Sequence, residues 1–251
     1  MTENEKNIYW LRFSKFQKTR ELAYVPLINK ALRNQVKHVI DNNLSQSSIA
    51  TISYAELYQV LKDLYNEAAL IYGASIVKNL PKTEKRYPMG FSQMMRELME
   101  NYFRLELLNT VNDITATTRE KIQEIFIKAT NEGLSFNDII KLLTEQSFTK
   151  IRAKLIARTE TVTAANQGAM FAAQSVGLKM NKVWISAKDF RTRRLPRYKF
   201  DHFHMNGVTV GFDELFDVSG QKMQQPGDRK HGATAGNICN CRCTVAFVEK
   251  K

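Results

Sequence analysis

Three cysteines lie close together near the end of the chain, in the stretch NICNCRCTVAF at residues 237–247. Cys239, Cys241 and Cys243 alternate with polar residues and lead into an apolar run. In an extended strand, residues two apart share one face, so the spacing predicts a strand with a thiol face. Such thiols suit a metal, because thiolates about 2.3 Å from a tetrahedral zinc need to be only roughly 4 Å apart.

The thiols could also form a disulfide or pack as apolar side chains instead of binding a metal. A disulfide between neighbours is disfavoured, because Cα atoms two residues apart on a strand are roughly 6.6 Å apart, at the upper edge of disulfide geometry. An odd number of cysteines also leaves one thiol unpaired. The remaining alternative is that the cysteines pack as small hydrophobic residues at a strand end. Spacing alone leaves metal binding and packing both open.

The elements that must position these thiols change in character along the chain. Residues 1 to about 112 favour helices, since apolar residues recur every three or four positions, most clearly at 54–77 and 92–114. Residues 79–91, with two prolines and a glycine, interrupt that pattern. We therefore expect a mostly helical first region.

Helix boundaries are marked more regularly after residue 113. Thr117 with Glu120 has the pattern of a capping box that opens a helix, and Gly133 is placed to end it. Ser135 with Asp138 predicts a second capping box. A long helical pattern then runs over 150–178, and Gly177 is placed to end it.

The period shifts towards two after this helix. Strands are predicted within 181–187, 205–212 and 241–249, separated by a basic loop and a glycine-rich stretch. Long loops between few strands are costly to order, which independently favours a metal that fixes them. The expected fold class is α+β, with a helical N-terminal region followed by helices packed on a small β-sheet with long loops.

The overall charge is strongly positive, at +12 with a pI near 9.6. Such a surplus favours contact with a polyanion such as nucleic acid, although a solvated surface gives the same composition.

Hydrophobic and charged fractions of 43% and 25% are those of a soluble globular protein, and no apolar run approaches the roughly 18 residues of a membrane span. The start of the chain lacks the pattern of a signal peptide, so we expect folding in a reducing cytoplasm. Basic residues concentrate in two places: Lys15, Lys18 and Arg20, and Lys188, Arg191, Arg193, Arg194, Arg197 and Lys199.

Five segments in a fixed order resemble a known family. IARTETVTAANQG, KVWISAKDFRTR, FDHFHMNGVTV, PGD and NICNCRCTVAF are similar to the Mu F-like minor head protein domain of tailed bacteriophages, also called the phage head morphogenesis domain. The resemblance covers roughly residues 120 to 248. The first half resembles the variable helical region that precedes this domain in such proteins. We therefore divide the chain into a helical region at 1–112, expected to dock on the portal or capsid, and a head morphogenesis domain at 113–251.

The resemblance implies a structural virion component. Family members are low-copy proteins inside the capsid, associated with the portal vertex and linked to head assembly, DNA packaging or DNA delivery. Expected partners are thus the portal protein, the inner capsid surface and packaged double-stranded DNA, contacted without sequence preference, with no membrane span. The protein would be made in the host bacterial cytoplasm, would lie in the virion interior and would not be an enzyme.

The family is also described as having His and Cys residues suggestive of zinc binding. Positions here that match its pattern are Arg158, Thr159, Glu160, Trp184, Asp189, Arg191, Arg193, Asp201, His202, Gly207, Pro226, Gly227, Asn240, Cys241, Arg242 and Cys243. We expect Cys241, Cys243 and His202 as zinc ligands. His204, His231 or Cys239 would compete for the fourth position, unless water fills it; Cys239 and His231 lie outside the family pattern.

The polar residues of the pattern allow an interpretation that needs no metal. Buried charges persist only when each has partners, so one network could tie the long helix, the basic loop and the last strand together. Its expected members are Arg158, Glu160, Asp189, Arg191, Arg193 and Arg242. The remaining basic residues of the loop are the expected DNA contacts: Lys188, Arg194, Arg197 and Lys199.

The alternative function is a metal-dependent nuclease or a free nucleic-acid-binding protein. The stretch DHFHMNG, followed by cysteines, is faintly similar to a His-Asn-His nuclease, in which a histidine activates water beside a metal. The downstream histidine and the strand-to-helix signals of such enzymes are missing from the sequence. We therefore expect no catalytic residues.

Overall fold

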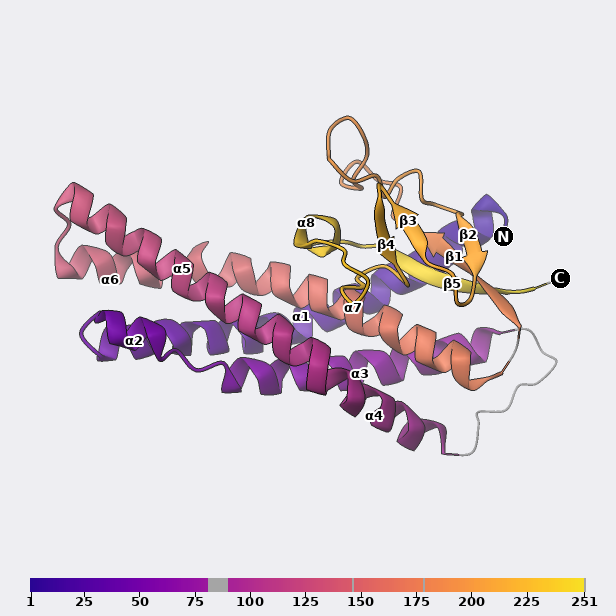
Figure 1. Ribbon diagram of the computed structural model, residues 1–251, viewed down its shortest axis with the longest axis horizontal. Helices are drawn as coiled ribbons and strands as arrows, with labels where there is room; N and C mark the ends of the chain where they lie inside the picture. Colours follow the sequence, from indigo (N-terminus) through magenta and orange to yellow (C-terminus); the bar gives the residue numbers. More distant parts are fainter. Residues whose placement is uncertain (81–89, 146, 178, 251) are drawn as a thin grey trace.

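The computed structural model describes residues 1–80, 90–145, 147–177 and 179–250. Long helices lie side by side along the longest axis, and a small sheet with long loops covers one end of them (Figure 1). Most of the interruption expected at 79–91 lies outside the described residues. The α+β class is confirmed. Of the described helices, none has both the length and the apolar character needed to cross a membrane.

The first region is helical as expected. Its helices are α1 (Glu3–Asp41), α2 (Gln46–Ala50), α3 (Ala55–Asn79), α4 (Phe91–Tyr102) and the π-helical turn η2 (Phe103–Leu107). Helix α1 begins with a capping box between Thr2 and Glu5 and spans 39 residues, about 58 Å. It therefore runs from beneath the sheet to the far end of the molecule (Figure 1).

Four further helices precede or accompany the sheet: α5 (Leu108–Glu132), α6 (Phe136–Thr144), α7 (Arg152–Ser175), with the π-helical turn η3 (Ser147–Ile151) before it, and the short α8 (Ala235–Ile238). Gly133 ends α5 with a φ of 61°, as predicted. Ser135 and Asp138 form the predicted capping box of α6. Gly177, with a φ of 68°, follows the last turn of α7.

The capping box predicted at Thr117 is wrong. Helix α4, η2 and α5 follow one another without a break, so the helix begins well upstream of this residue. The Thr117 hydroxyl donates instead to the Asp113 carbonyl, four residues back. A threonine inside a helix commonly makes this bond, and no cap is needed where the preceding turn is already helical.

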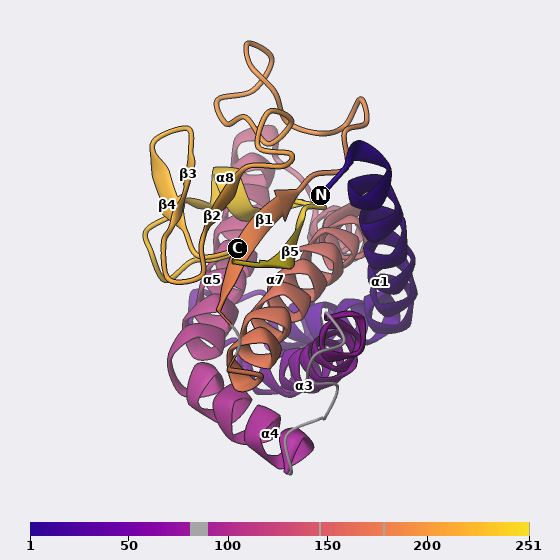
Figure 2. The ribbon, with the colours of Figure 1, turned by 90° about the vertical axis from the view of Figure 1, so that its right-hand side faces the viewer.

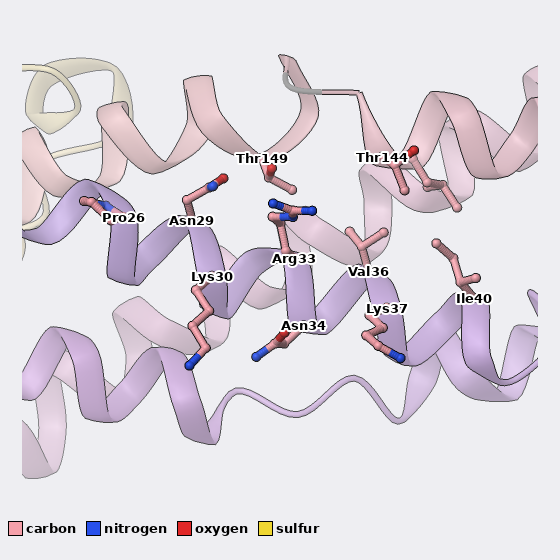
Figure 3. Close-up of a pocket in the computed structure, with 11 residues that line it drawn as sticks. Pro26, Asn29, Lys30, Arg33, Asn34, Val36, Lys37, Ile40, Thr144 and Thr149 are labelled. Carbon is pink, nitrogen blue, oxygen red and sulfur yellow. The ribbon is translucent and has the colours of Figure 1, made fainter.

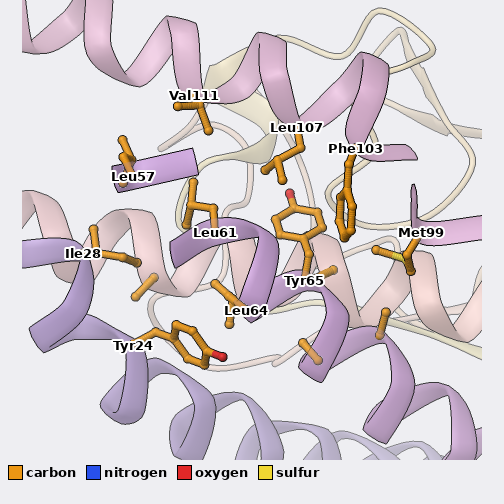
Figure 4. Packing of buried hydrophobic residues seen from close by; sticks show 14 of the residues in the cluster. Tyr24, Ile28, Leu57, Leu61, Leu64, Tyr65, Met99, Phe103, Leu107 and Val111 are labelled. Carbon is orange, nitrogen blue, oxygen red and sulfur yellow. The ribbon is translucent and has the colours of Figure 1, made fainter. Parts of the chain in front are cut away.

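Helix α7 lies at the centre of the bundle and crosses α3 at very short range. A Cβ built on Gly168 would lie 2.4 Å from the Ala69 Cα. Any residue with a side chain would clash at this distance, so the crossing requires glycine. Around this crossing, a large cluster of buried apolar side chains joins α1, α3, α4, η2, α5 and α7 (Figure 4). The expected boundary between residues 112 and 113 falls inside α5, and this cluster takes residues from both sides of it.

The sheet has three antiparallel strands in the order β2–β1–β5. They are β1 (Met180–Ile185), β2 (Thr209–Gly211) and β5 (Thr244–Glu249), within the predicted strand ranges except that β1 begins one residue earlier. Trp184 pairs with Val245, and both belong to a cluster shared with α7. Val183, Ile185 and Ala246 form a separate cluster with Tyr9 and Trp10 of α1. The sheet is thus fixed to two helices.

A second small hairpin was not predicted. Strands β3 (Phe216–Val218) and β4 (Gln221–Met223) pair around a turn at Ser219 and Gly220, both with positive φ. Figure 2 shows this hairpin beside the main sheet, with the long loop after β1 projecting beyond both.

The predicted thiol-bearing strand is also wrong in its first half. Cys239 follows α8, Asn240 takes a left-handed φ of 60°, and β5 begins only at Thr244. Because the chain turns at Asn240, the three thiols do not share a strand face. Cys241 and Cys243 are buried, whereas Cys239 is exposed.

Candidate metal centre

Two thiols and one imidazole meet beneath the projecting loop. The Sγ atoms of Cys241 and Cys243 lie 3.4 and 3.6 Å from Nδ1 of His202. All three side chains are buried, and each offers a donor atom within 4.8 Å of the other two. Residues about 40 positions apart are thus brought together, as the sequence predicts.

The backbone holds each donor in place. The N–H groups of His202 and Phe203 both donate to the Arg193 carbonyl at 2.9 Å, which closes the loop that carries the imidazole. The Asn240 N–H donates to the Thr159 hydroxyl on α7 at 2.9 Å, and the Cys241 N–H donates to the Ile238 carbonyl at 3.2 Å. The turn that aims the two thiols is therefore attached to the central helix.

Asn237, which the sequence analysis did not single out, orients the imidazole. Its Nδ2 donates to the Val218 carbonyl at 3.2 Å and to Gln221 Oε1 at 3.1 Å, so its Oδ1 faces His202 Nε2 at 2.6 Å. That oxygen can only accept, which places the imidazole proton on Nε2. The lone pair of Nδ1 then points to the thiols, as in histidines that bind zinc.

The spacing fits a tetrahedral zinc ion. With zinc–sulfur and zinc–nitrogen distances of about 2.3 and 2.0 Å, a tetrahedron requires sulfur and nitrogen to be roughly 3.5 Å apart. The two separations here are 3.4 and 3.6 Å. Thiolate and imidazole donors favour zinc over magnesium or calcium, which bind oxygen. The residues present therefore fit a zinc ion held by Cys241, Cys243 and His202.

The electrostatics of the cluster favour one thiolate. The hydrogen bond from Cys243 and the nearby His202 hold the pKa of Cys241 well below its usual value against the effect of burial. Burial and the neighbouring Cys241 raise the pKa of Cys243 well above its usual value. Burial lowers the pKa of His202, but the charge of Cys241 and its hydrogen bond to the imidazole have a larger, opposite effect. The pKa of His202 is therefore raised.

The candidates for a fourth ligand have other partners. His204 is exposed and lies 2.7 Å from Asp201. His231 lies 2.6 Å from Asp228 in the glycine-rich stretch. Cys239 is exposed and does not join the buried group. Within the described part of the chain, the group contains three donors.

The six residues expected to form one polar network take separate sets of partners. Arg242 makes a bidentate ion pair with Asp189, at 2.6 and 2.5 Å, which joins the last strand to the loop. Arg191 approaches the same carboxylate at 3.6 Å. The hydrogen bonds from Arg242 hold the pKa of Asp189 well below its usual range.

Two further pairs involve partners that the sequence did not indicate. Arg158 makes a bidentate pair with Glu21 of α1, at 3.0 and 2.7 Å, and also donates to Asn240. Glu160 is buried and accepts from Arg229 at 3.0 and 2.8 Å. It also accepts from the Tyr65 hydroxyl at 2.7 Å.

Arg193 makes no ion pair among the described residues. It donates to the carbonyls of Asn237 and Cys239, and thereby joins the loop to the segment before the thiols. The six residues thus connect helix, loop and strand, as proposed from sequence, but through several local units.

Comparison with known proteins decides the family. A family model described as phage Mu protein F like protein matches residues 120–246, just over half of the chain. The chain belongs to the phage Mu protein F like family. Its members are phage head morphogenesis proteins. Neither the curated proteins nor the solved structures gave a match to this chain. The matched range includes α7, strands β1 to β4, the first half of β5 and the whole thiol–imidazole cluster.

The loop expected to contact DNA projects from this Mu F-like part of the molecule (Figure 2). Arg194 lies over the ring of Phe203, Arg197 over Tyr198, and Lys199 over Phe200, at 5.3 to 5.6 Å. Lys188 pairs with Glu3 at 3.2 Å, so its charge is partly neutralised. Phe190 of the same loop is 75% accessible and adds an exposed apolar side chain beside these cations.

A separate groove of about 480 Å³ lies along α1, beside α6 and η3 (Figure 3). Lys30, Arg33 and Lys37 line it together with apolar and hydroxyl side chains. None of the residues predicted as functional belongs to this groove. It therefore adds positive charge to the far end of α1, away from the thiols.

Proposed function

We propose that this head morphogenesis protein is an internal minor component of the phage head, associated with the portal vertex, where it acts in head assembly, DNA packaging or DNA delivery without catalysing a reaction. The family match over residues 120–246 carries this proposal. That range contains all three residues of the thiol–imidazole cluster. The helices before it supply a long surface for docking on the portal protein or the inner capsid surface.

The projecting loop is the proposed contact to packaged double-stranded DNA. Arg194, Arg197 and Lys199 form no ion pair among the described residues, and each lies against an aromatic ring that limits its motion. Cations held this way favour phosphate contacts, which position a protein on DNA without reading its sequence. The net charge of +12 adds to this attraction.

Gel-shift titration over a series of salt concentrations tests the DNA contact. Replacing Arg194, Arg197 and Lys199 together by glutamine should weaken binding and lower the slope of log K against log salt by about 2.7, if each residue makes one phosphate contact. The matched control replaces Lys37, Lys121 and Lys128, which are exposed on α1 and α5. Equal effects of the two sets, or binding that salt does not weaken, would contradict the loop contact.

Location in the virion tests the function itself. Mass spectrometry of purified particles should find this chain at low copy number, and cross-linking should connect helices α1 to α5 to the portal protein or the inner capsid surface. After osmotic release of DNA, the chain should become accessible to protease only once the head opens. Absence of the chain from particles would reject the proposal.

The metal, where bound, would hold the loop and the last strand together. A zinc ion supplies bonds between segments that share few strand contacts, and its binding free energy then contributes to folding. Cys241, Cys243 and His202 would hold it, and Asn237 would fix the imidazole. The elemental analysis of protein purified without chelator should give about one zinc per chain.

A metal-dependent nuclease is the second candidate, because a zinc site with three protein ligands leaves a position where water could bind. Plasmid DNA incubated with the protein and divalent metals tests it. Cleavage that is lost in His202→Ala would favour the nuclease. We expect no cleavage, since His204 and His231 pair with aspartates and neither belongs to the buried group of donors.

A further inference from the structure

The thiol–imidazole cluster faces a small hollow that no side chain of the cluster fills. This hollow has a volume of about 110 Å³ and is lined by all three donor residues. The other lining residues are Ala187, Arg191, Thr192, Arg193, Tyr198, Asn240 and Arg242. Three of them are arginines and none is acidic. We propose that this hollow binds a small oxyanion, phosphate or a carboxylate, as the fourth ligand of the metal.

The proposal depends on the metal-binding part of the proposed function and goes beyond it in naming a ligand. Zinc bound by proteins has four ligands, and three come from the buried group. Of the residues predicted to compete for the fourth position, His204 and His231 are paired with Asp201 and Asp228, and Cys239 lies outside the buried group. A ligand from outside the chain therefore has to complete the coordination.

The charge of the surroundings favours an anion over a neutral ligand. Two thiolates and a neutral imidazole cancel the two charges of zinc, so the arginines of the hollow are not balanced by the metal site itself. Asp189 neutralises Arg242 through a bidentate pair. Arg193 donates to two carbonyls, which leaves its positive charge in place. Arg191 keeps only a longer approach to Asp189, at 3.6 Å.

Arg191 is consequently the residue expected to recognise the anion. Its guanidinium can form two parallel hydrogen bonds with phosphate or carboxylate oxygens, and such charge-assisted pairs are strong. More than half of its side chain is accessible, so it can turn towards a ligand without disturbing a core. The small volume admits one phosphate or acetate group. An internal phosphate of a DNA strand would be too encumbered to enter, but a terminal phosphate could.

Cobalt(II) substitution supplies a direct readout, because the visible absorption of cobalt reports the number and kind of its ligands. The cobalt protein should show bands of two thiolates and one nitrogen. Titration with inorganic phosphate, and separately with acetate, should shift these bands to saturation. A short duplex with a 5′-phosphate, compared with the same duplex ending in a hydroxyl, distinguishes a DNA end from the free ion as the source.

Two variants that each remove one positive charge test the role of the hollow. Arg191→Gln should raise the phosphate dissociation constant about tenfold, as expected for loss of a charge-assisted pair. Lys222→Gln also removes one positive charge but does not line the hollow, so it should leave that constant within about twofold. Circular dichroism of both variants checks that the fold is retained.

Several results would overturn the inference. Bands that do not respond to either anion, or that respond equally in both variants, exclude an anion site lined by Arg191. A spectrum of three thiolates that changes in Cys239→Ser would show that Cys239 completes the coordination. Failure to bind cobalt at all would remove the metal on which the inference rests. The location of the chain in virions is measured independently, so none of these results decides the structural role in the head.

Discussion

The helical bundle and the sheet-bearing end of this protein are stabilised in different ways. In the bundle, the main buried cluster consists of aliphatic, methionine and aromatic side chains and connects long helices along their length (Figure 4). Around the sheet, buried polar groups are numerous: Glu160, Asn166, Lys182, His202, Asn237 and Thr244 are all at most 2% accessible. A region with strands of three to six residues cannot bury enough apolar surface to fix its long loops, so specific polar partners fix them.

Asn166 on α7 shows how such a partner works. Its Nδ2 donates to the carbonyls of Pro226 and Cys243, and its Oδ1 accepts from the Thr244 hydroxyl and the Val245 N–H. One side chain thereby joins the glycine-rich stretch and the last strand to the central helix. Every hydrogen-bonding position of the amide is used, which makes the arrangement specific.

Breaking the buried ion pair should have the largest effect on the sheet-bearing end. Glu160→Gln leaves the partly buried Arg229 without its charge partner, and we expect a loss of about 3 kcal/mol or slightly more in the free energy of unfolding. Chemical denaturation monitored by circular dichroism measures it. Asp217→Asn, which breaks the exposed pair with Lys222, is the control and should cause no measurable change. A similar loss of unfolding free energy in both variants would contradict the idea that buried polar partners stabilise the sheet-bearing end.

Adding a methyl group at the crossing of α3 and α7 should cause the next largest loss of stability, this time in the bundle. Alanine normally stabilises a helix relative to glycine by about 1 kcal/mol. In Gly168→Ala, however, the new methyl group would meet the Ala69 backbone at 2.4 Å. We therefore expect a net loss of about 3 kcal/mol, measured by the same denaturation.

Gly73→Ala sharpens the comparison within the bundle. Its added methyl group would meet the Gly168 carbonyl oxygen at 2.9 Å and the mobile end of Met95 at 3.1 Å. The loss should be smaller than for Gly168→Ala. A gain in stability in Gly168→Ala would show that the helices can separate at little cost.

Removing the metal should affect the sheet-bearing end alone. At free zinc about 100-fold above its dissociation constant, binding contributes about 2.7 kcal/mol. A chelator should thus lower the stability of the native protein by this amount. Trp184 fluorescence should change, since its ring lies 5.7 Å from that of His202, while the helical circular dichroism signal is retained.

A matched pair of cysteine variants makes that test specific. Cys243→Ala should abolish the effect of chelator, and Cys239→Ala should preserve it, because only the former thiol belongs to the buried group. Comparing each variant with and without chelator separates metal binding from the packing cost of the substitution. An equal chelator effect in both variants would argue against the predicted ligands.

The same contrast explains which features the sequence could predict. The capping box of Ser135 and Asp138 depends on residues three apart, and it was predicted correctly. Thr117 has the same local pattern, but the preceding residues are already helical from Phe91 onwards, so there is no helix start for it to cap. Local signals succeed where no neighbouring element overrides them.

Partners distant in sequence could not be chosen from the sequence. Arg158 is paired with Glu21, 137 residues away, and Glu160 with Arg229, 69 residues away. The residue types of a polar network were recognisable, whereas which charges meet depends on the packing of α1 and the glycine-rich stretch against α7. The meeting of His202 with Cys241 and Cys243 was predicted because the family resemblance supplied the long-range information. Asn237 lacked any such signal.

The buried lysine of β1 provides the smallest and most selective test of the contrast. Lys182 is fully buried, and its Nζ donates to the Gln224 carbonyl at 2.8 Å. Burial lowers its pKa from 10.5 to about 8. The folded protein therefore holds fewer protons than the unfolded chain between about pH 8 and 10.5, and the contribution of Lys182 to stability rises with pH across this window.

Replacing this lysine should remove that pH dependence. The free energy of unfolding of Lys182→Met should rise less between pH 8 and 10 than that of the native protein, with a difference on the order of 2 kcal/mol. Urea denaturation at pH 7, 8, 9 and 10 measures both curves, and Lys222→Met, on the exposed hairpin, is the control. If the native and Lys182→Met curves stay parallel, the ammonium group is solvated in the folded protein, and the sheet-bearing end tolerates its charge without the desolvation cost that its buried position implies.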